Sequence, residues 1–95
     1  MSSDFELIHN HHERAVFAAV QALAPRHPDL ADPATLADIA CVALNRLPPR
    51  YIRHEVDFAF YLSDRERKET EVAVNEAVGS AFAFVRERIA LKKPR

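Results

Sequence analysis

Two adjacent prolines, Pro48 and Pro49, divide the sequence and limit how the chain can continue from one half into the other. An apolar stretch of helical type, residues 36–47, runs directly into this pair. Proline fixes its own φ and keeps the preceding residue out of the α region, so a helix must end here and the chain must leave it extended. We therefore expect a stiff elbow at the two prolines, with a helix before it.

The composition favours helices over sheets on both sides of this elbow. The chain has 95 residues and a single glycine, Gly79, and it lacks the Asn-Gly and Asp-Gly pairs that form tight hairpins. Apolar residues make up 48% and charged residues 28%, which is usual for a globular domain. We expect residues 1–95 to form one small all-α domain, a bundle of three main helices with an extended arm after the elbow.

The first two helices are predicted from their start signals and their apolar spacing. Ser3 and Glu6 form a capping-box pattern, and apolar residues at spacings of three and four then predict a helix over residues 4–24. Asp32 followed by Pro33 is a favoured helix start and predicts a second helix that ends at the elbow. Apolar residues surround most of this second helix, so we expect it to be the central core helix.

The third predicted helix is long enough to raise the question of assembly. Ser63 and Glu66 repeat the capping-box pattern, and the helical pattern continues over residues 64–90. At 1.5 Å per residue this helix is about 40 Å long, whereas a compact domain of this size has a radius of gyration of about 13 Å. The overhang and the small residues Gly79 and Ser80, which permit close approach of another helix, favour a symmetric homodimer. Packing on the first two helices alone is the alternative.

The segment over residues 51–62 is ambiguous. Apolar residues alternate strictly with polar or small ones, which is typical of a strand with one buried face. The sequence shows no second strand to pair with it. We expect an extended arm that crosses the surface, with a helical turn or pairing across a dimer axis as alternatives.

The residues around the elbow offer groups that suit a nucleotide. Arginine matches phosphate in a bidentate manner, tyrosine can stack on a base, and asparagine both donates and accepts hydrogen bonds at a base edge. We therefore expect phosphate contacts from the arginines, stacking by the tyrosine and base contact by the asparagine; the residues are Asn45, Arg46, Arg50, Tyr51 and Arg53. The alternative is a rigid corner whose arginines are simply solvated.

Metal binding and catalysis find little support in the sequence. His9, His12 and Glu13 would share one face of the first helix, but the catalytic His-Glu-x-x-His pattern is absent and a third ligand is not evident. A metal-dependent enzyme using this face is therefore a weaker alternative. Cys41 lies in an apolar run, so we expect it to be buried. We predict no enzymatic activity, no metal and no cofactor.

Charge and hydropathy limit the partners that the chain is expected to meet. The formal net charge is −1 with neutral histidines, so no basic field favours direct binding of nucleic acid. We see no signal peptide and no apolar stretch of 18 residues. A cytoplasmic location without membrane contact is the expectation.

Residues 38–51, with the core Leu-Asn-Arg-Leu-Pro-Pro-Arg-Tyr, resemble the signature of the late competence development protein ComFB family. Residues 8–16 resemble the opening helix of that family and residues 58–63 also fit, so the resemblance covers about residues 6–90. Some family members hold structural zinc with several cysteines. The single Cys41 excludes such a site here.

The resemblance implies a function in signalling. Some ComFB-like proteins are similar to receptors for cyclic dinucleotides. The resemblance therefore implies a non-enzymatic cytoplasmic protein that binds such a ligand and relays the signal to an unknown downstream protein. Cyclic di-GMP is the first candidate ligand and cyclic di-AMP is the second. Asn10 and Arg14 in the opening helix are further candidate ligand contacts. The alternative function is an adaptor that binds no small molecule and docks proteins through Phe58, Phe60 and Tyr61.

Overall fold

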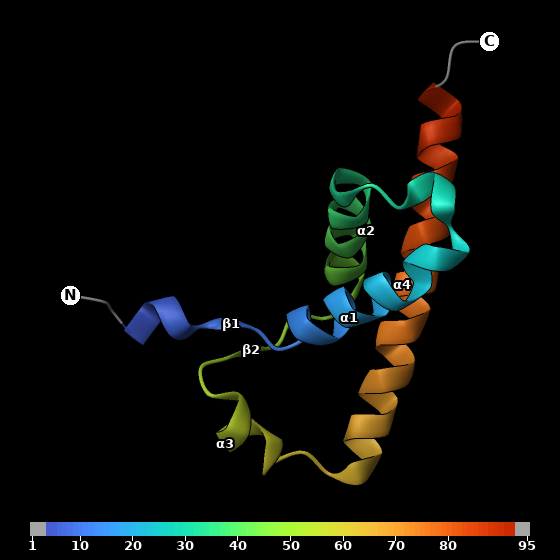
Figure 1. The fold of residues 1–95 in the computed structure, drawn as a ribbon. Helices are drawn as coiled ribbons and strands as arrows, with labels where there is room; N and C mark the ends of the chain where they lie inside the picture. The colour runs from blue at the N-terminus through green and yellow to red at the C-terminus, as the bar shows by residue number, and fades with distance from the viewer. Residues whose placement is uncertain (1–3, 93–95) are drawn as a thin grey trace.

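The computed structural model describes residues 4–92 and is built mainly from helices, which confirms the all-α class (Figure 1). Three main helices form the body: α1 (Glu13–Leu23), α2 (Pro33–Arg46) and α4 (Asp64–Lys92). The remaining elements are a short helix α3 (Glu55–Ala59), the strands β1 (His9–Asn10) and β2 (Tyr51–Ile52), and the 3-10 turns Asp4–Leu7, Ala24–Arg26 and Pro28–Leu30.

The starts of α2 and α4 are fixed by the capping residues that the sequence predicts. Asp32 Oδ2 accepts hydrogen bonds from the backbone N–H of Thr35 at 3.0 Å and from its hydroxyl at 2.9 Å, and these bonds lower the pKa of Asp32. Ser63 Oγ accepts the backbone N–H of Glu66 at 3.1 Å. At the other end of α2, Leu47 is already extended, with φ −90° and ψ 137°, as a residue before proline requires.

The core lies where α1, α2 and α4 pack against one another. Its largest fully buried side chains are Val16 of α1, Ile39 of α2, and Val78 and Phe82 of α4. Six buried residues come from α4 and three from α2, so α4 rather than α2 is the central helix. Cys41 is exposed on α2, and the prediction that it is buried is wrong.

The first helix begins much later than predicted. Residues 4–12 form a 3-10 turn, a strand and a turn, and α1 starts only at Glu13. Phe5 and Ile8 are two of the apolar residues whose spacing predicted this helix, and they are 81% and 46% exposed. The predicted cap Ser3 lies outside the described residues. A helix over residues 4–24 is wrong because the first part of that segment pairs with a distant strand instead.

That distant strand is β2, directly after the elbow. It pairs antiparallel with β1 in the register His9 to Ile52 and Asn10 to Tyr51. The expectation of an unpaired extended arm over residues 51–62 is therefore wrong. After two paired residues the chain turns into α3, whose carbonyl at Ala59 accepts a hydrogen bond from Arg67 Nη2 at 2.7 Å. The short ribbon and α3 together form a ribbon lobe, residues 4–10 and 51–62.

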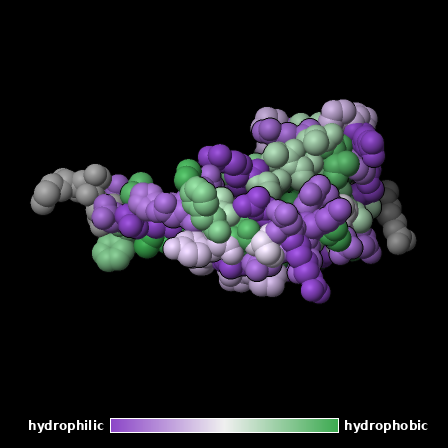
Figure 2. Space-filling view, turned by 90° about the horizontal axis from the view of Figure 1, so that it is seen from below, coloured by the Kyte–Doolittle hydropathy of each residue, from purple (hydrophilic) through white to green (hydrophobic). Residues whose placement is uncertain are grey.

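The ribbon lobe projects from the three-helix core (Figure 1). The molecule measures 52 × 38 × 21 Å along its principal axes, so it is elongated. Hydrophobic side chains are exposed among hydrophilic ones on the projecting arm (Figure 2). Within residues 4–92, no helix has the length and apolar character needed to span a membrane.

Candidate functional site

A pocket of about 330 Å³ lies beside the ribbon, where the first turn of α1, the end of α2 and β2 meet. Because Tyr51 is paired with Asn10, the two side chains lie on the same face of the ribbon. The Tyr51 side chain is 68% exposed. We call this space the tyrosine pocket; it is lined by Asn10, Glu13, Leu44, Asn45, Leu47, Pro49 and Tyr51.

Asn10 holds the wall of this pocket together. Its buried Oδ1 accepts hydrogen bonds from the backbone N–H groups of His12, at 3.1 Å, and of Arg50, at 3.4 Å. Its own backbone N–H donates to Glu13 Oε2 at 3.2 Å. Asn10 thus connects the start of α1 to the elbow and fixes the positions of Tyr51 and Glu13. Asn10 therefore positions the pocket wall, and because it also lines the pocket, its contact with a ligand stays a prediction.

Arg50 turns towards α3. Its guanidinium carbon lies 4.6 Å from the ring centre of Phe58, and the imidazole of His11 contacts the same ring edge-on at 4.6 Å. The backbone strengthens this arrangement, because the His11 N–H donates to the Arg50 carbonyl at 2.7 Å. Arg50 borders a separate cavity of about 300 Å³ between the two prolines of the elbow and the first turns of α4.

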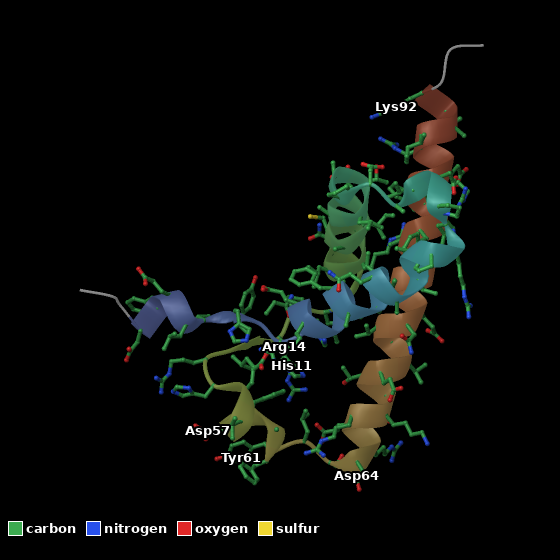
Figure 3. The ribbon with its side chains drawn as sticks, viewed as in Figure 1. His11, Arg14, Asp57, Tyr61, Asp64 and Lys92 are labelled. Atoms are coloured by element: carbon green, nitrogen blue, oxygen red, sulfur yellow. The ribbon has the colours of Figure 1, made fainter. Side chains whose placement is uncertain are left out.

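A larger cleft of about 760 Å³ lies between α1 and residues 53–57; we call it the α1–α3 cleft. Arg14 on α1 and Asp57 on α3 come from its two sides (Figure 3). The cleft is lined by His9, Glu13, Arg14, Phe17, Ala18, Gln21, Arg53, His54, Glu55, Val56 and Asp57. Glu13 lines the tyrosine pocket as well, so the two hollows are neighbours.

Ion pairs involve several residues of the α1–α3 cleft, and the pair of Arg14 with Glu55 links its two sides. Glu55 lies 3.4 Å from Arg14 Nη1 and 3.4 Å from His9 Nε2, and Arg53 lies 4.0 Å from Asp4. The pKa of His9 is raised, first by the hydrogen bond of its Nδ1 to the Leu7 carbonyl at 2.8 Å and then by Glu55. The cleft therefore combines cations with carboxylates and is not a purely basic surface.

The model of the late competence development protein ComFB family matches residues 9–89 of this chain. The chain belongs to the ComFB family. No curated protein matches it, and no solved structure does. The matched span contains α1, α2, α3, both strands and nearly all of α4, so the tyrosine pocket and the α1–α3 cleft lie within the part of the chain that is characteristic of ComFB proteins.

In this ComFB-family chain the seven residues predicted for the ligand site are distributed over several places. Asn10, Asn45 and Tyr51 line the tyrosine pocket, and Arg14 and Arg53 line the neighbouring cleft. The other two point elsewhere: Arg50 contacts Phe58, and Arg46 contacts Phe84 and donates a hydrogen bond to Ser80 Oγ on α4.

Glu13 is the pocket residue that the sequence reasoning assigned differently, to a histidine-rich helix face. The signal that would have identified it is the Asn-x-x-Glu spacing from Asn10 to Glu13, which resembles a capping box and places Glu13 next to Asn10 at the entry to α1. The shared helix face of His9, His12 and Glu13 does not exist, because His9 lies in β1. Within residues 4–92 no three His, Cys, Asp or Glu side chains are placed to hold a metal ion.

Proposed function

We propose that this ComFB-family protein is a non-enzymatic cytoplasmic receptor for a cyclic dinucleotide. Cyclic di-GMP is the first candidate ligand and cyclic di-AMP is the second. The receptor would relay the signal to a downstream protein. The observation that carries the proposal is the convergence of Tyr51, Asn45 and Glu13, from three different elements, on one pocket large enough for a nucleobase. The exposure of the Tyr51 ring supports it, because an exposed aromatic plane is available for stacking.

The tyrosine pocket favours guanine over adenine. Stacking of a base on an aromatic side chain contributes about 1–3 kcal/mol. The Asn45 amide can both donate and accept at a base edge. The Glu13 carboxylate only accepts, which suits the adjacent N–H donors at N1 and N2 of guanine; adenine offers a single donor group beside an acceptor. Cyclic di-GMP is therefore the first candidate.

Arg14 and Arg53 are the arginines that we assign to the phosphates. They line the cleft that shares Glu13 with the tyrosine pocket, and their guanidinium groups match phosphate geometry. Their present partners are Glu55 and Asp4, at 3.4 Å and 4.0 Å. Both arginines and Asp4 are well exposed, so these ion pairs contribute little, and exchanging them for a phosphate costs little.

Calorimetric titration with cyclic di-GMP and cyclic di-AMP, with GTP and GMP as controls, tests the proposal. Tyr51→Ala should weaken binding about tenfold or more, because it removes the stacking plane. Tyr61→Ala is a matched control, since Tyr61 is also exposed, at 82%, and lies outside both hollows. The proposed site would be refuted if neither dinucleotide gave binding heat. It would also be refuted if Tyr51→Ala and Tyr61→Ala lost the same amount of affinity.

Glu13→Gln tests the choice of base. Glutamine keeps an oxygen that can accept the Asn10 N–H, so the start of α1 should remain intact. Its affinity for cyclic di-GMP should fall, whereas its affinity for cyclic di-AMP should change little. A parallel loss for both dinucleotides would mean that Glu13 maintains the pocket without reading the base.

A protein adaptor is the second candidate function. Of the three predicted docking residues, Phe60 and Tyr61 are 84% and 82% exposed, whereas Phe58 is half-buried against Arg50 and His11. Val56 of the same lobe is 71% exposed and adds to the apolar surface. Tyr61 lies at the outer side of the lobe, away from the three-helix core (Figure 3). A folded chain that binds neither cyclic dinucleotide in calorimetry would favour this function.

A further inference from the structure

Two arginines on the core side of the molecule share a single aromatic ring. The guanidinium carbon of Arg46, from α2, lies 4.9 Å from the ring centre of Phe84, and that of Arg88, one turn further along α4, lies 5.7 Å from it. Within the described chain, 4–92, neither arginine has a carboxylate within ion-pair distance. Two positive charges therefore contact the same ring, and neither is paired with a carboxylate among the described residues.

This situation differs from that of most other arginines in the chain. Five arginines lie within 4.0 Å of a carboxylate oxygen; they are Arg14, Arg53, Arg65, Arg67 and Arg86. At Arg46 and Arg88 the Phe84 ring takes the place of the carboxylate. An aromatic face attracts a cation but carries no net charge, so it orients the two guanidinium groups and leaves their charge uncompensated.

Ser80 adds a hydroxyl to the same place. Arg46 Nη1 donates a hydrogen bond to Ser80 Oγ, so the serine oxygen is already an acceptor and its hydrogen is free to donate to an anion. Ser80, Phe84 and Arg88 follow one another at spacings of four and so lie on one face of α4. We call these residues, with Arg46, the arginine cluster.

We propose that the arginine cluster binds the phosphate group of a phosphate monoester. Arginine forms bidentate, charge-assisted hydrogen bonds to phosphate, and Phe84 orients both planar groups for this purpose. A monoester carries a charge of about −1.5 to −2 at neutral pH, which matches two unpaired cations better than a carboxylate or a phosphodiester does. None of the four residues lines the tyrosine pocket or the α1–α3 cleft, so this is a second, independent site.

Titration of the ¹⁵N-labelled chain with inorganic phosphate at constant ionic strength, followed by NMR, tests this site. The backbone amide signals of Ser80, Phe84 and Arg88 should shift and saturate, and chloride should not reproduce the shifts. Arg46→Gln and Arg88→Gln should each weaken binding about tenfold or more, since each removes a charged donor. Both arginines are exposed, so the variants should fold, as circular dichroism can confirm.

Arg65→Gln is the matched control, because Arg65 is exposed on the same helix and its replacement changes the net charge equally. It should bind phosphate as the natural chain does.

A phosphate monoester could come from a modified protein side chain or from a free sugar phosphate. O-phosphoserine and ribose 5-phosphate represent these two sources, and the probe that binds with the higher affinity identifies the source. Shifts that do not saturate, or an equal loss in Arg65→Gln, would overturn the site. Cyclic di-GMP binding should be unchanged in Arg88→Gln. The proposal for the arginine cluster and the proposal for the tyrosine pocket can therefore be refuted independently.

Discussion

His11 is the titratable residue on which the attachment of the ribbon lobe depends most directly. Its ring contacts Phe58, which Arg50 covers as well, and its Nδ1 is buried without a hydrogen-bond partner among the described residues. Burial lowers the pKa of His11, and the nearby His12 and Arg50 lower it further, against the opposing effect of Glu55. The neutral imidazole is thus the form that the folded lobe accommodates.

A pH-dependent stability follows from this residue. Because the pKa of His11 is lower in the folded state, the unfolded chain binds more protons in the window below about pH 6.5, and acid should destabilise the fold there. His11→Phe keeps an aromatic ring against Phe58 and removes the titration. Urea unfolding at about pH 7.5 and about pH 5.5 should show a smaller loss of stability on acidification in His11→Phe than in the natural chain.

His9 gives this experiment its internal control. The pKa of His9 is raised, so its contribution to stability is present below about pH 6.5 and is lost as the pH rises through the folded value. His9→Asn should therefore increase the loss of stability on acidification, which is the opposite of the change expected for His11→Phe. Identical pH dependence in all three chains would contradict both assignments.

The helices whose ends depend on neighbouring residues could be predicted from the sequence, and the elements that depend on distant residues could not. The cap at Asp32, the cap at Ser63 and the stop at Pro48 act within one turn of their helices, so α2 and α4 were predicted closely. β1 and β2 depend on each other across the whole of α1 and α2. Residues 5–12 also fit a helical spacing, and nothing local excludes that interpretation.

The same distinction applies to the candidate site. Tyr51 and Asn45 meet in one pocket, as their closeness to the elbow suggested. Arg46 follows Asn45 directly, but consecutive side chains of a helix point about 100° apart, so Arg46 reaches α4 instead. Arg50 is oriented by Phe58, a residue of α3, and a helical turn in this segment was predicted only as an alternative to the extended arm. Position along the chain therefore identified the region of the site, but not that Arg46 and Arg50 would turn away from it.

Gly79 provides a test of the outer face of α4. It is exposed in the middle of the helix, and a Cβ added there would have no heavy atom within 4 Å. Gly79→Ala should raise the free energy of unfolding by about 1 kcal/mol, because alanine loses less backbone entropy in a helix. The matched change Ala83→Gly, also exposed on α4, should lower it by a similar amount. Urea denaturation measures both, and destabilisation by Gly79→Ala would indicate that another chain packs at this position.

As a whole, the molecule is more extended than its length requires. Its radius of gyration is 15.5 Å, against about 12–13 Å for a compact domain of this size. The 29 residues of α4 extend beyond the core, and large apolar side chains are exposed near both ends of the described chain, with Phe5 at 81% and Leu91 at 76%. Such surfaces are typical of chains that associate.

We therefore predict a symmetric homodimer in solution, the commonest closed assembly. Sedimentation equilibrium should give a mass of twice the 10.8 kDa of one chain. Dilution should produce a reversible shift towards the single chain, because association depends on concentration. A mass of one chain over the whole accessible concentration range would contradict the prediction.

The ribbon of two strands, each only two residues long, closes a loop that contains all of α1 and α2. Closing so long a loop costs chain entropy, and few backbone hydrogen bonds offset it. The strands should therefore separate often while the three helices stay packed, and their amide protons should exchange with solvent faster than those of the core. A molecule bound against Tyr51 would slow that exchange. Under the proposed receptor function, the state that a downstream protein recognises would be the ribbon lobe with its two strands paired.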